Sequence, residues 1–340
     1  MDSKSETPEK IRVSVGSAIV LGLINGRIDA KPTTAYLLTY HEGKCTANCM
    51  FCPQARSSSG RADMLSRVTW PAFPLKNVIE GIEKAVKSGE LKRVCIQALN
   101  YPRVFEDILS IVSLILSRIK VPISVSCQPL RRENLERLKL AGVERVGIPL
   151  DAATKEIFEK IKGKYAGGPY RWESQVKILL EAVEVFGKNS VSTHLIVGLG
   201  ETEKEMIQRI QWCTDKWIFP GLFAFTPISG TQLESLPQPP LESYRRIQLG
   251  HYLITKRISR FENFKFDEGG KIIDFGVENE TLRKVIESGE PFLTSGCPNC
   301  NRPYYNERPG GPLYNYPRPL RKDEIEEIKS LLLKNAEFRF

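Results

Sequence analysis

The sequence predicts an α/β protein built as a partial or complete TIM-like β/α barrel with a C-terminal cap. Short apolar strands alternate with helices through most of the chain, a pattern that favours a parallel sheet with right-handed crossovers. The chain has 340 residues and a mass of 38.5 kDa, which suits one barrel of this type. A cysteine-rich loop follows the first predicted strand, at the carboxyl end where such barrels carry their chemistry.

The hydrophobic pattern predicts six strands with helices between them. Apolar residues at helical spacing predict a first helix over residues 14–25, which ends before Gly26. The strands are expected over residues 35–40, 92–99, 121–127, 144–150, 190–197 and 221–227. The helices are expected over residues 75–87, 104–119, 130–140, 155–161 and 173–186. Thr202 and Glu205 have the spacing of a capping box, which predicts that the next helix starts there.

The last third of the chain changes in composition. A proline-rich stretch, residues 236–240, precedes a helix expected over residues 241–259, and residues 264–275 are expected to add strand. From Gly296 the sequence is rich in Pro, Gly, Arg and Tyr, which predicts an ordered cap before a final helix over residues 323–334. We expect a loose N-terminal extension and helix over residues 1–30, a barrel over 31–290 and a cysteine-containing cap and helix over 291–340.

Charge and cysteine usage indicate the kind of environment and partner. The chain has 49 basic and 40 acidic residues, a net charge of +9, which favours an acidic partner. Basic and acidic residues are interleaved along predicted helices, a pattern more typical of solvated faces than of a nucleic-acid groove. Eight cysteines, several inside apolar strands, indicate metal ligands in a reducing compartment, and we expect a cytoplasmic protein. The best apolar run, residues 17–24, is too short to span a membrane.

The loop YHEGKCTANCMFCPQAR, residues 40–56, places Cys45, Cys49 and Cys52 in a CxxxCxxC array. Thiolates presented from one compact loop are typical ligands of a cubane iron–sulfur cluster. Three thiols hold three of the four irons, so one iron is left for a ligand that is not protein unless a distant residue closes the site. A structural zinc loop is the alternative, but zinc sites usually pair two short Cys/His hooks.

Phe51 immediately before Cys52 completes a CxxxCxφC signature, and the sequence resembles the radical S-adenosylmethionine (SAM) superfamily. The resemblance implies a [4Fe–4S] cluster whose open iron is chelated by the amine and carboxylate of SAM. It also implies reductive cleavage of SAM to a 5′-deoxyadenosyl radical, which removes hydrogen from an unactivated carbon. By position, the resemblance places Phe51 near the adenine.

Further SAM contacts carry over by position from the same resemblance. Asp151, after the fourth predicted strand, corresponds to the residue that accepts hydrogen bonds from the ribose hydroxyls. Ile196 and Gly198 resemble the fifth-strand adenine contact, and Asn100 stands where the methionyl amine is received. Pro149 replaces the asparagine that accompanies the ribose-binding aspartate in biotin synthase.

Residues 36–231 also resemble biotin synthase, in which strand cysteines hold an auxiliary cluster. Cys95 and Cys127 fall on the matching second and third strands, whereas Ser192 stands where a third cysteine is expected. A CPNC hook, Cys297 and Cys300, is absent from biotin synthase. We therefore predict an auxiliary [4Fe–4S] cluster held by four thiolates, those of the two strand cysteines and of the hook. The alternative is a zinc site at the hook, with both strand cysteines merely packed.

For Cys213 and His194 the sequence indicates no neighbouring residue with which either would form a site. Cys213, on a predicted helix, is expected to be a core or surface residue, and His194 on the fifth strand is a candidate for facing the cavity.

A biotin-synthase-like barrel with an auxiliary [4Fe–4S] cluster resembles a subunit of the archaeal-type two-component lipoyl synthase. This implies sulfur insertion into an octanoyl chain on a lipoyl carrier domain or a glycine cleavage H-type protein. It also implies a second radical SAM subunit and an electron donor such as ferredoxin. Two alternatives remain: another radical SAM enzyme that uses the second cluster for electron transfer, and a protein that modifies or binds nucleic acid.

Overall fold

An eight-stranded mixed sheet organises the chain. The computed structural model describes residues 7–127, 131–307 and 310–333. In spatial order the strands are β10 (Ile218–Ala224), β9 (Val191–Val197), β8 (Arg145–Gly147), β7 (Ile123–Ser126), β6 (Arg93–Gln97), β2 (Thr34–Thr39), β1 (Lys10–Val13) and β5 (Ala72–Pro74). All pairs from β2 to β10 are parallel, whereas β1 pairs antiparallel with both β2 and β5.

The barrel is partial, because the sheet starts at β10 and ends at β5 and no ladder among the described residues joins these two edges. The six predicted strands are confirmed, with β8 three residues shorter than expected at its carboxyl end. Its ladder stops before Pro149, which has no N–H to donate. Strands β1 and β5 were not predicted. The first of them places residues of the expected N-terminal extension inside the barrel sheet.

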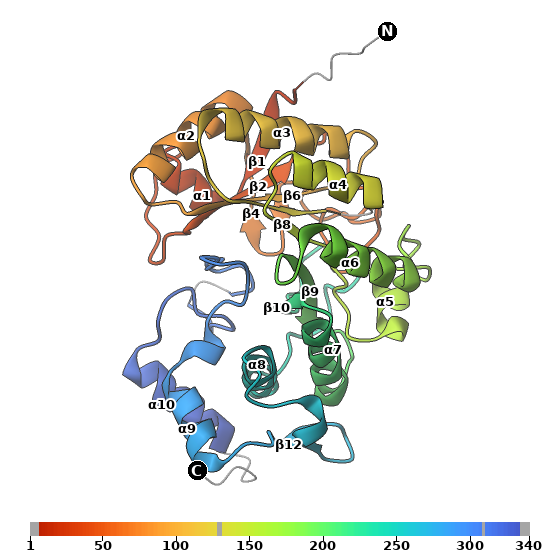
Figure 1. Cartoon of the computed structure of the whole chain (residues 1–340), viewed down its shortest axis with the longest axis vertical. Helices are drawn as coiled ribbons and strands as arrows, with labels where there is room; N and C mark the ends of the chain where they lie inside the picture. The colour runs from red at the N-terminus through yellow and green to blue at the C-terminus, as the bar shows by residue number, and fades with distance from the viewer. Residues whose placement is uncertain (1–6, 128–130, 308–309, 334–340) are drawn as a thin grey trace.

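Ten α-helices are described, most of them crossovers between parallel strands. They are α1 (Val15–Val20), α2 (Leu75–Lys87), α3 (Val104–Arg118), α4 (Arg132–Leu140), α5 (Lys155–Ile161), α6 (Trp172–Phe186), α7 (Glu203–Asp215), α8 (Leu241–Thr255), α9 (Asn279–Glu287) and α10 (Lys322–Leu333). Figure 1 shows α1 to α4 over one part of the sheet, and α8, α9 and α10 at the opposite end of the molecule. The expected capping box is confirmed, since the Thr202 side chain accepts from Glu205 N and the Glu205 carboxylate accepts from Thr202 N.

Some sequence predictions differ from the structure in extent, and some elements were not predicted. The first helix is six residues long, because the chain turns at Gly22 with φ +69°. The strand expected over residues 264–275 is a separate hairpin of β11 (Lys265–Phe266) and β12 (Ile272–Asp274). A second small hairpin, β3 (Met64–Leu65) with β4 (Val68–Thr69), and helix α9 were not predicted. Leu130 and Lys334, the predicted ends of two helices, lie outside the described residues.

Alternation along the strands separates an outer core from an inner cavity. On β9, Val191, Thr193, Leu195 and Val197 are buried, and the residues between them are half-buried. Successive side chains of a strand point to opposite faces of the sheet. Val191, Leu195 and Val197 belong to the large core under the helices, which also contains Val94, Ile96 and Val125. The other face of the sheet therefore lines an open interior rather than a second packed core.

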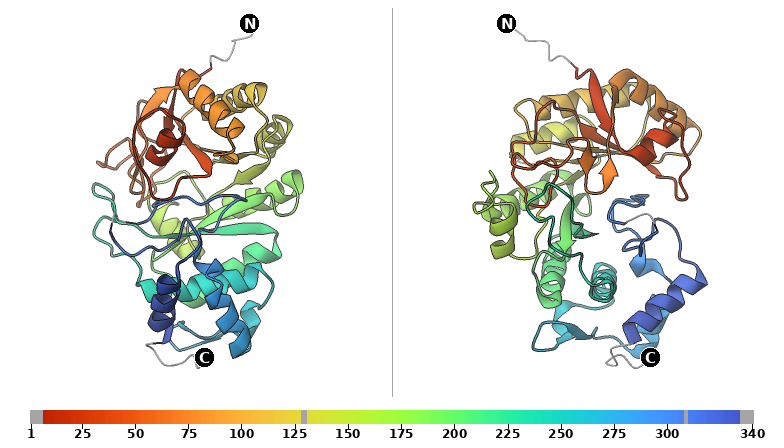
Figure 2. Two further views of the ribbon diagram at one scale, coloured as in Figure 1. Left: turned by 90° about the vertical axis from the view of Figure 1, so that its left-hand side faces the viewer. Right: turned by 180° about the vertical axis from the view of Figure 1, so that it is seen from behind.

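The C-terminal segment returns to the start of the barrel. The Asn301 side chain accepts from Thr33 N at 3.1 Å and donates to Lys31 O at 2.9 Å. Leu293 forms a bridge with Tyr316, which joins the two arms of this segment. In the right-hand view of Figure 2 the blue C-terminal segment accordingly approaches the red and orange N-terminal part. Residues expected to form a cap thus contact the amino-terminal ends of the barrel strands.

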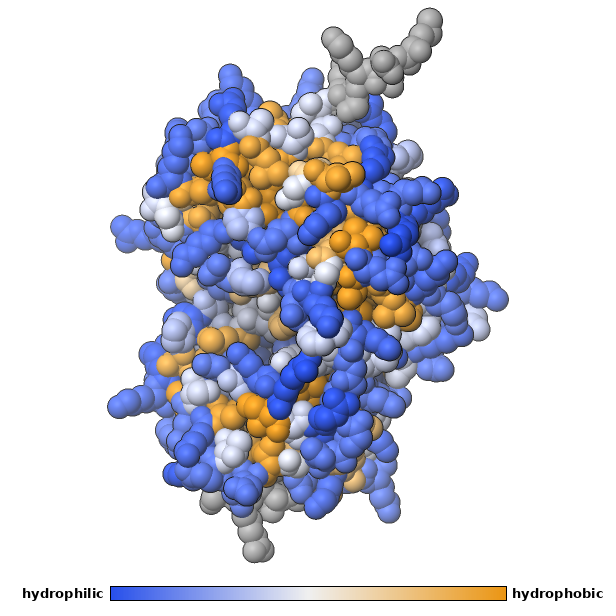
Figure 3. All heavy atoms as spheres, in the orientation of Figure 1, coloured by the Kyte–Doolittle hydropathy of each residue, from blue (hydrophilic) through white to orange (hydrophobic). Residues whose placement is uncertain are grey.

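Polar side chains dominate the outline of the face in Figure 3, with apolar atoms in patches between them. Among the described helices, none combines the length and the apolar character that a membrane crossing requires.

Candidate active site

The CxxxCxxC loop leaves the carboxyl end of β2 and folds back on itself through its own backbone. Cys45 N donates to Gln54 O at 2.9 Å, and Cys52 N donates to Cys49 O at 3.0 Å. These turns bring all three cysteines to the wall of one cavity. We call Cys45, Cys49 and Cys52 the loop group.

Asn48 fixes this loop to its surroundings. Its amide nitrogen donates to Ala166 O at 2.6 Å, and its carbonyl oxygen accepts from Ser57 N at 3.0 Å and Ser57 Oγ at 2.7 Å. Met50 N also donates to Ile161 O at 2.8 Å. The loop is therefore held by the end of α5 and the residues after it as well as by its own turns, so its thiols have a defined place.

Two thiols of the loop group, those of Cys49 and Cys52, are poor acids as they stand. Burial raises the pKa of Cys49 well above its usual value, while the ammonium of Lys162 opposes this shift. Burial also raises the pKa of Cys52 to about 12, and the neighbouring Cys45 adds to the shift. Three thiolates at this place need a strongly positive partner, and the irons of a cluster supply one. The residues present therefore fit an iron–sulfur cluster.

Asn100 supports the loop rather than lining the cavity. Its backbone N–H donates to Cys45 Sγ at 3.2 Å, its side-chain amide donates to Tyr170 Oη at 2.8 Å, and its carbonyl accepts from Thr46 N at 2.9 Å. Asn100 is not among the described residues of the cavity wall. Its assignment to the methionyl amine stays a prediction.

Asp151 lies in the cavity wall and forms a buried ion pair that the sequence did not reveal. Lys162, which is fully buried, donates to Asp151 Oδ2 at 2.6 Å and to Pro149 O at 2.6 Å. The lysine ammonium also lies 5.7 Å from the Phe158 ring centroid and 5.1 Å from that of Tyr170. This pairing holds the Asp151 carboxylate in a fixed place in the cavity wall, where its oxygens can accept hydrogen bonds.

One sequence signal points to Lys162 in retrospect. It lies four residues after Phe158 and directly follows Ile161, so it continues the buried face of α5. A charge on that face requires a buried partner, and Asp151 is the acidic residue that fills this role. Asp151 adopts φ +66°, and its N–H donates to His194 O at 2.8 Å.

The expected adenine contacts divide into two kinds. Phe51 and Ile196 line the cavity, whereas Gly198 is not among its described wall residues. Gly198 instead has φ +101°, and a Cβ there would lie 2.9 Å from Pro239. Its N–H donates to the Glu201 carboxylate at 2.7 Å. Backbone geometry alone accounts for a glycine at this position.

A second set of thiols faces the same cavity, which has a volume of about 240 Å³. Cys95 on β6 is in register with Tyr36 on β2 and Ser124 on β7. Cys300 Sγ lies 3.3 Å from Tyr36 Oη, and Cys297 Sγ accepts from Ser124 Oγ at 3.5 Å. Strand Cys95 and the CPNC hook therefore converge on one layer of the barrel interior. We call Cys95, Cys297 and Cys300 the assembled group.

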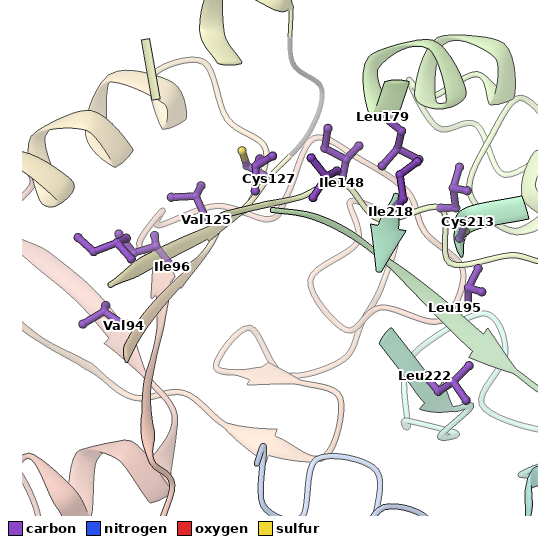
Figure 4. Close-up of a cluster of buried hydrophobic side chains, with 14 of the residues drawn as sticks. Val94, Ile96, Val125, Cys127, Ile148, Leu179, Leu195, Cys213, Ile218 and Leu222 are labelled. Atoms are coloured by element: carbon purple, nitrogen blue, oxygen red, sulfur yellow. The ribbon is translucent and has the colours of Figure 1, made fainter. Parts of the chain in front are cut away.

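The fourth predicted thiol does not join this group. Cys127 is in the outer core, and Figure 4 shows its side chain on the same side of the sheet as Val125 and Ile96. Cys127 is among the residues that border the cavity, and so is Val125, which also belongs to the outer core. Ser124 faces the cavity, and Cys127 is three residues further on, so it takes the opposite face. Because Cys127 belongs to the outer core and also borders the cavity, its assignment as a fourth cluster ligand stays a prediction.

The hook is held at the amino-terminal ends of the strands. Cys300 N donates to Cys297 O at 2.9 Å, which closes the hook turn. Asn299 O accepts from Thr33 Oγ1 at 2.5 Å, and Pro298 O accepts from Arg93 Nε at 3.2 Å. The loop group follows the carboxyl end of β2. The two thiol groups therefore lie toward opposite ends of the parallel strands, with the cavity between them.

His194 lines the cavity, and Cys213 lies in the outer core, one of the two places expected for it. Burial lowers the pKa of His194 to about 4. Within the described ranges, no three His, Cys, Asp or Glu side chains converge on one point as ligands of a single metal ion, whereas the thiolates of an iron–sulfur cluster each bind a different iron.

Known proteins match this chain in sequence and in fold. Residues 40–213 match the family model of the radical SAM superfamily. Biotin synthase 1 of Corynebacterium diphtheriae is 26% identical over 181 residues, 53% of this chain and 47% of the relative, so the chain spans about half the length of that relative. Biotin synthase of Microcystis aeruginosa is 23% identical over 276 residues, 77% of this chain and 71% of the relative.

The fold agrees with a solved structure of methylornithine synthase, with a TM-score of 0.51 at 14% identity over 71% of this chain and 66% of the other. The family model covers more than half of this chain and includes the CxxxCxxC loop, Asp151 and β9. The chain therefore belongs to the radical SAM superfamily.

Proposed function

We propose that this protein is a radical SAM enzyme that inserts sulfur into an unactivated carbon, as one subunit of a two-component lipoyl synthase. The observation that carries the proposal is the assembled group, a second set of thiols facing the same cavity as the loop group. A substrate in this cavity contacts both groups at once. Sulfur insertion needs this arrangement, because one centre must generate a substrate radical and the other must present sulfur.

The residues of the loop group hold the SAM-binding [4Fe–4S] cluster, and the assembled group holds the auxiliary one. When bound, the first cluster supplies the electron that cleaves SAM to a 5′-deoxyadenosyl radical. Asp151 accepts hydrogen bonds from the ribose hydroxyls, and Lys162 holds its carboxylate in place. Phe51 and Ile196 supply apolar contacts for the adenine ring.

The cavity wall supports an alkyl substrate. Leu38, Leu65, Phe223, Phe225 and Tyr305 contribute apolar or aromatic surface to it. Such a wall binds a hydrocarbon chain and keeps water away from a carbon radical. An octanoyl chain attached to a carrier protein fits this chemistry, since its polar attachment point stays with the carrier. The net charge of +9 favours an acidic carrier domain or H-type protein through electrostatic steering.

The test is an anaerobic incubation with SAM, a reductant such as dithionite or ferredoxin, and an octanoyl-lysyl carrier domain. The reaction is run with and without a second radical SAM subunit, and mass spectrometry follows the carrier. We expect thiolated octanoyl product for the wild type and for Cys213→Ala. We expect 5′-deoxyadenosine without thiolated product for Cys297→Ala.

Two outcomes overturn the proposal. Formation of 5′-deoxyadenosine without thiolated carrier, even with the partner subunit, excludes lipoyl synthesis. An oxidised product without new sulfur assigns the second centre to electron transfer instead.

A further inference from the structure

A buried cation lies directly outside the cavity wall, next to the loop group. Lys162 is fully buried at the end of α5, and its ammonium donates to Asp151 Oδ2 and to Pro149 O, both at 2.6 Å. Asp151 borders the cavity, whereas Lys162 is not among the described residues of its wall. Lys162 can therefore influence a bound molecule only through neighbouring groups and through its charge.

The backbone joins Lys162 to the loop group through the residues beside each of them. Met50, which follows Cys49, donates its N–H at 2.8 Å to the carbonyl of Ile161, which precedes Lys162. Cys49 also packs in one apolar cluster with Ile161 and Phe158 of α5. A charge among apolar side chains is screened little, so the ammonium acts on a thiolate at Cys49 more strongly than a surface charge would.

A second path of contacts leads from Lys162 to Cys45. The ammonium lies 5.1 Å from the ring centroid of Tyr170, and the hydroxyl of that ring accepts from the Asn100 side chain at 2.8 Å. The backbone N–H of Asn100 donates to Cys45 Sγ at 3.2 Å. One continuous set of contacts thus extends from Asp151 through the lysine to a thiol of the loop group.

The two charges of the ion pair act on Cys49 with opposite signs. Burial raises the pKa of the Cys49 thiol well above its usual value, the Lys162 ammonium opposes this rise, and the Asp151 carboxylate adds to it. An electron added to a cluster at this thiol is a further negative charge, so Lys162 favours reduction and Asp151 opposes it. A further cation beside the loop, Lys44, is half-buried, so solvent screens more of its charge.

We propose that Lys162 is a positioning residue for SAM cleavage, which holds Asp151 for the ribose and whose charge favours electron addition to the cluster of the loop group. The inference deepens the proposed function and rests on its assignment of a [4Fe–4S] cluster to that group. It depends neither on the auxiliary centre nor on the lipoyl substrate. The step concerned is the addition of one electron from a reductant such as dithionite, in which no bond forms or breaks.

The experiment uses the full-length chain with Cys297→Ala, so that the iron bound after anaerobic reconstitution is that of the loop group. The midpoint potential of its cluster is measured without SAM, by electron paramagnetic resonance during a dithionite titration. Asp151→Asn should raise the ratio of reduced to oxidised cluster at a fixed potential about tenfold, a shift of about 59 mV for one electron. Adding Lys162→Met should reverse this shift, whereas adding Lys162→Arg should preserve it. The Asp151→Asn background avoids a buried carboxylate without a partner.

The affinity for SAM reports on the other role of Lys162. It is measured by equilibrium dialysis with the oxidised cluster, which does not cleave SAM. Lys162→Met alone should weaken SAM binding about tenfold, the loss of one charge-assisted hydrogen bond, but should change it little in the Asp151→Asn background. Lys155→Met is the matched control, because it removes an exposed lysine of the same helix that pairs with Glu173. It should match its parent in both measurements.

The inference is overturned if Lys162→Met leaves the potential of the Asp151→Asn variant unchanged, or if Lys162→Arg lowers it as much. It is equally overturned if Lys162→Met weakens SAM binding to the same extent with and without Asp151, or if the double variant loses the iron that Asp151→Asn retains. A parent chain without iron at the loop group would instead refute the cluster assignment itself. The expected shifts in a protein that makes no thiolated carrier would sustain the inference and refute the lipoyl proposal.

Discussion

The two thiol groups of the cavity are built in different ways. The loop group comes from residues 45–52 of one loop, which its own backbone turns and Asn48 hold together. The assembled group joins a strand residue, Cys95, to a hook roughly 200 residues later in the sequence. The first site therefore depends on local structure, and the second depends on docking of the C-terminal segment. Damage to one site should spare the other.

The sharpest test of this independence is Cys49→Ala. The loop cluster loses one of its three thiolates, so SAM cleavage to 5′-deoxyadenosine should fall to background and about four irons per chain should be lost. The irons of the assembled group should stay. Chromatographic assay of 5′-deoxyadenosine together with iron analysis checks both statements. Cys213→Ala, which removes a buried thiol of the outer core, is the control and should match the wild type.

Lys162→Met probes the ion pair that accompanies the loop group. The substitution keeps much of the apolar stem but leaves Asp151 buried without its partner. We expect the protein to lose about 3–5 kcal/mol of unfolding free energy, measured by denaturant titration without iron. Addition of Asp151→Asn should recover part of this loss, because the uncompensated charge is removed. A double variant no more stable than the single one would contradict the ion-pair account.

Asn48→Ala tests the local turns that hold the loop group, and Asn301→Ala tests the docking of the C-terminal segment that carries the hook. Each removes an amide that bridges separate backbone segments, at an expected cost of about 1–3 kcal/mol. In a Cys49→Ala background, Asn301→Ala should lower the iron retained by the assembled group. In a Cys297→Ala background, Asn48→Ala should lower the iron retained by the loop group. Equal losses in both backgrounds would show that the sites are coupled.

The smallest expected effect concerns two buried histidines near the cavity. Burial lowers the pKa of His194 and of His251 to about 4, against about 6.5 in the unfolded chain. Their contribution to stability is complete above the unfolded pKa and is lost as pH falls toward the folded pKa. Between about pH 7 and about pH 5.5 we expect a loss of about 1 kcal/mol per histidine.

Replacing each histidine with Asn should flatten this part of the pH–stability curve, as measured by thermal unfolding. His194 lies in the cavity wall, and His251 is hydrogen-bonded to Pro220 O on β10. The first variant therefore tests burial at the cavity, and the second tests burial between α8 and β10. An unchanged slope would show that neither histidine stays neutral on folding.

The parts of the molecule predicted from sequence are those set by neighbours in the chain. The CxxxCxxC spacing, the six parallel strands and the Thr202 capping box each depend on residues close in sequence. The facing of Cys127 depends on register between strands, because Cys95 pairs with Ser124 and the odd spacing from there to Cys127 reverses the side chain. Lys162 escaped prediction because its partner is brought near by tertiary folding.

The docking of the hook also fixes an order of maturation. During synthesis the loop group is complete after Cys52, whereas Cys95 must wait for Cys297 and Cys300 to be made and for Asn301 to reach residues 31–33. Until then a strand thiol faces an open cavity without its companions. Iron delivery should therefore fill the loop group first, and the assembled group only once the returning segment has docked.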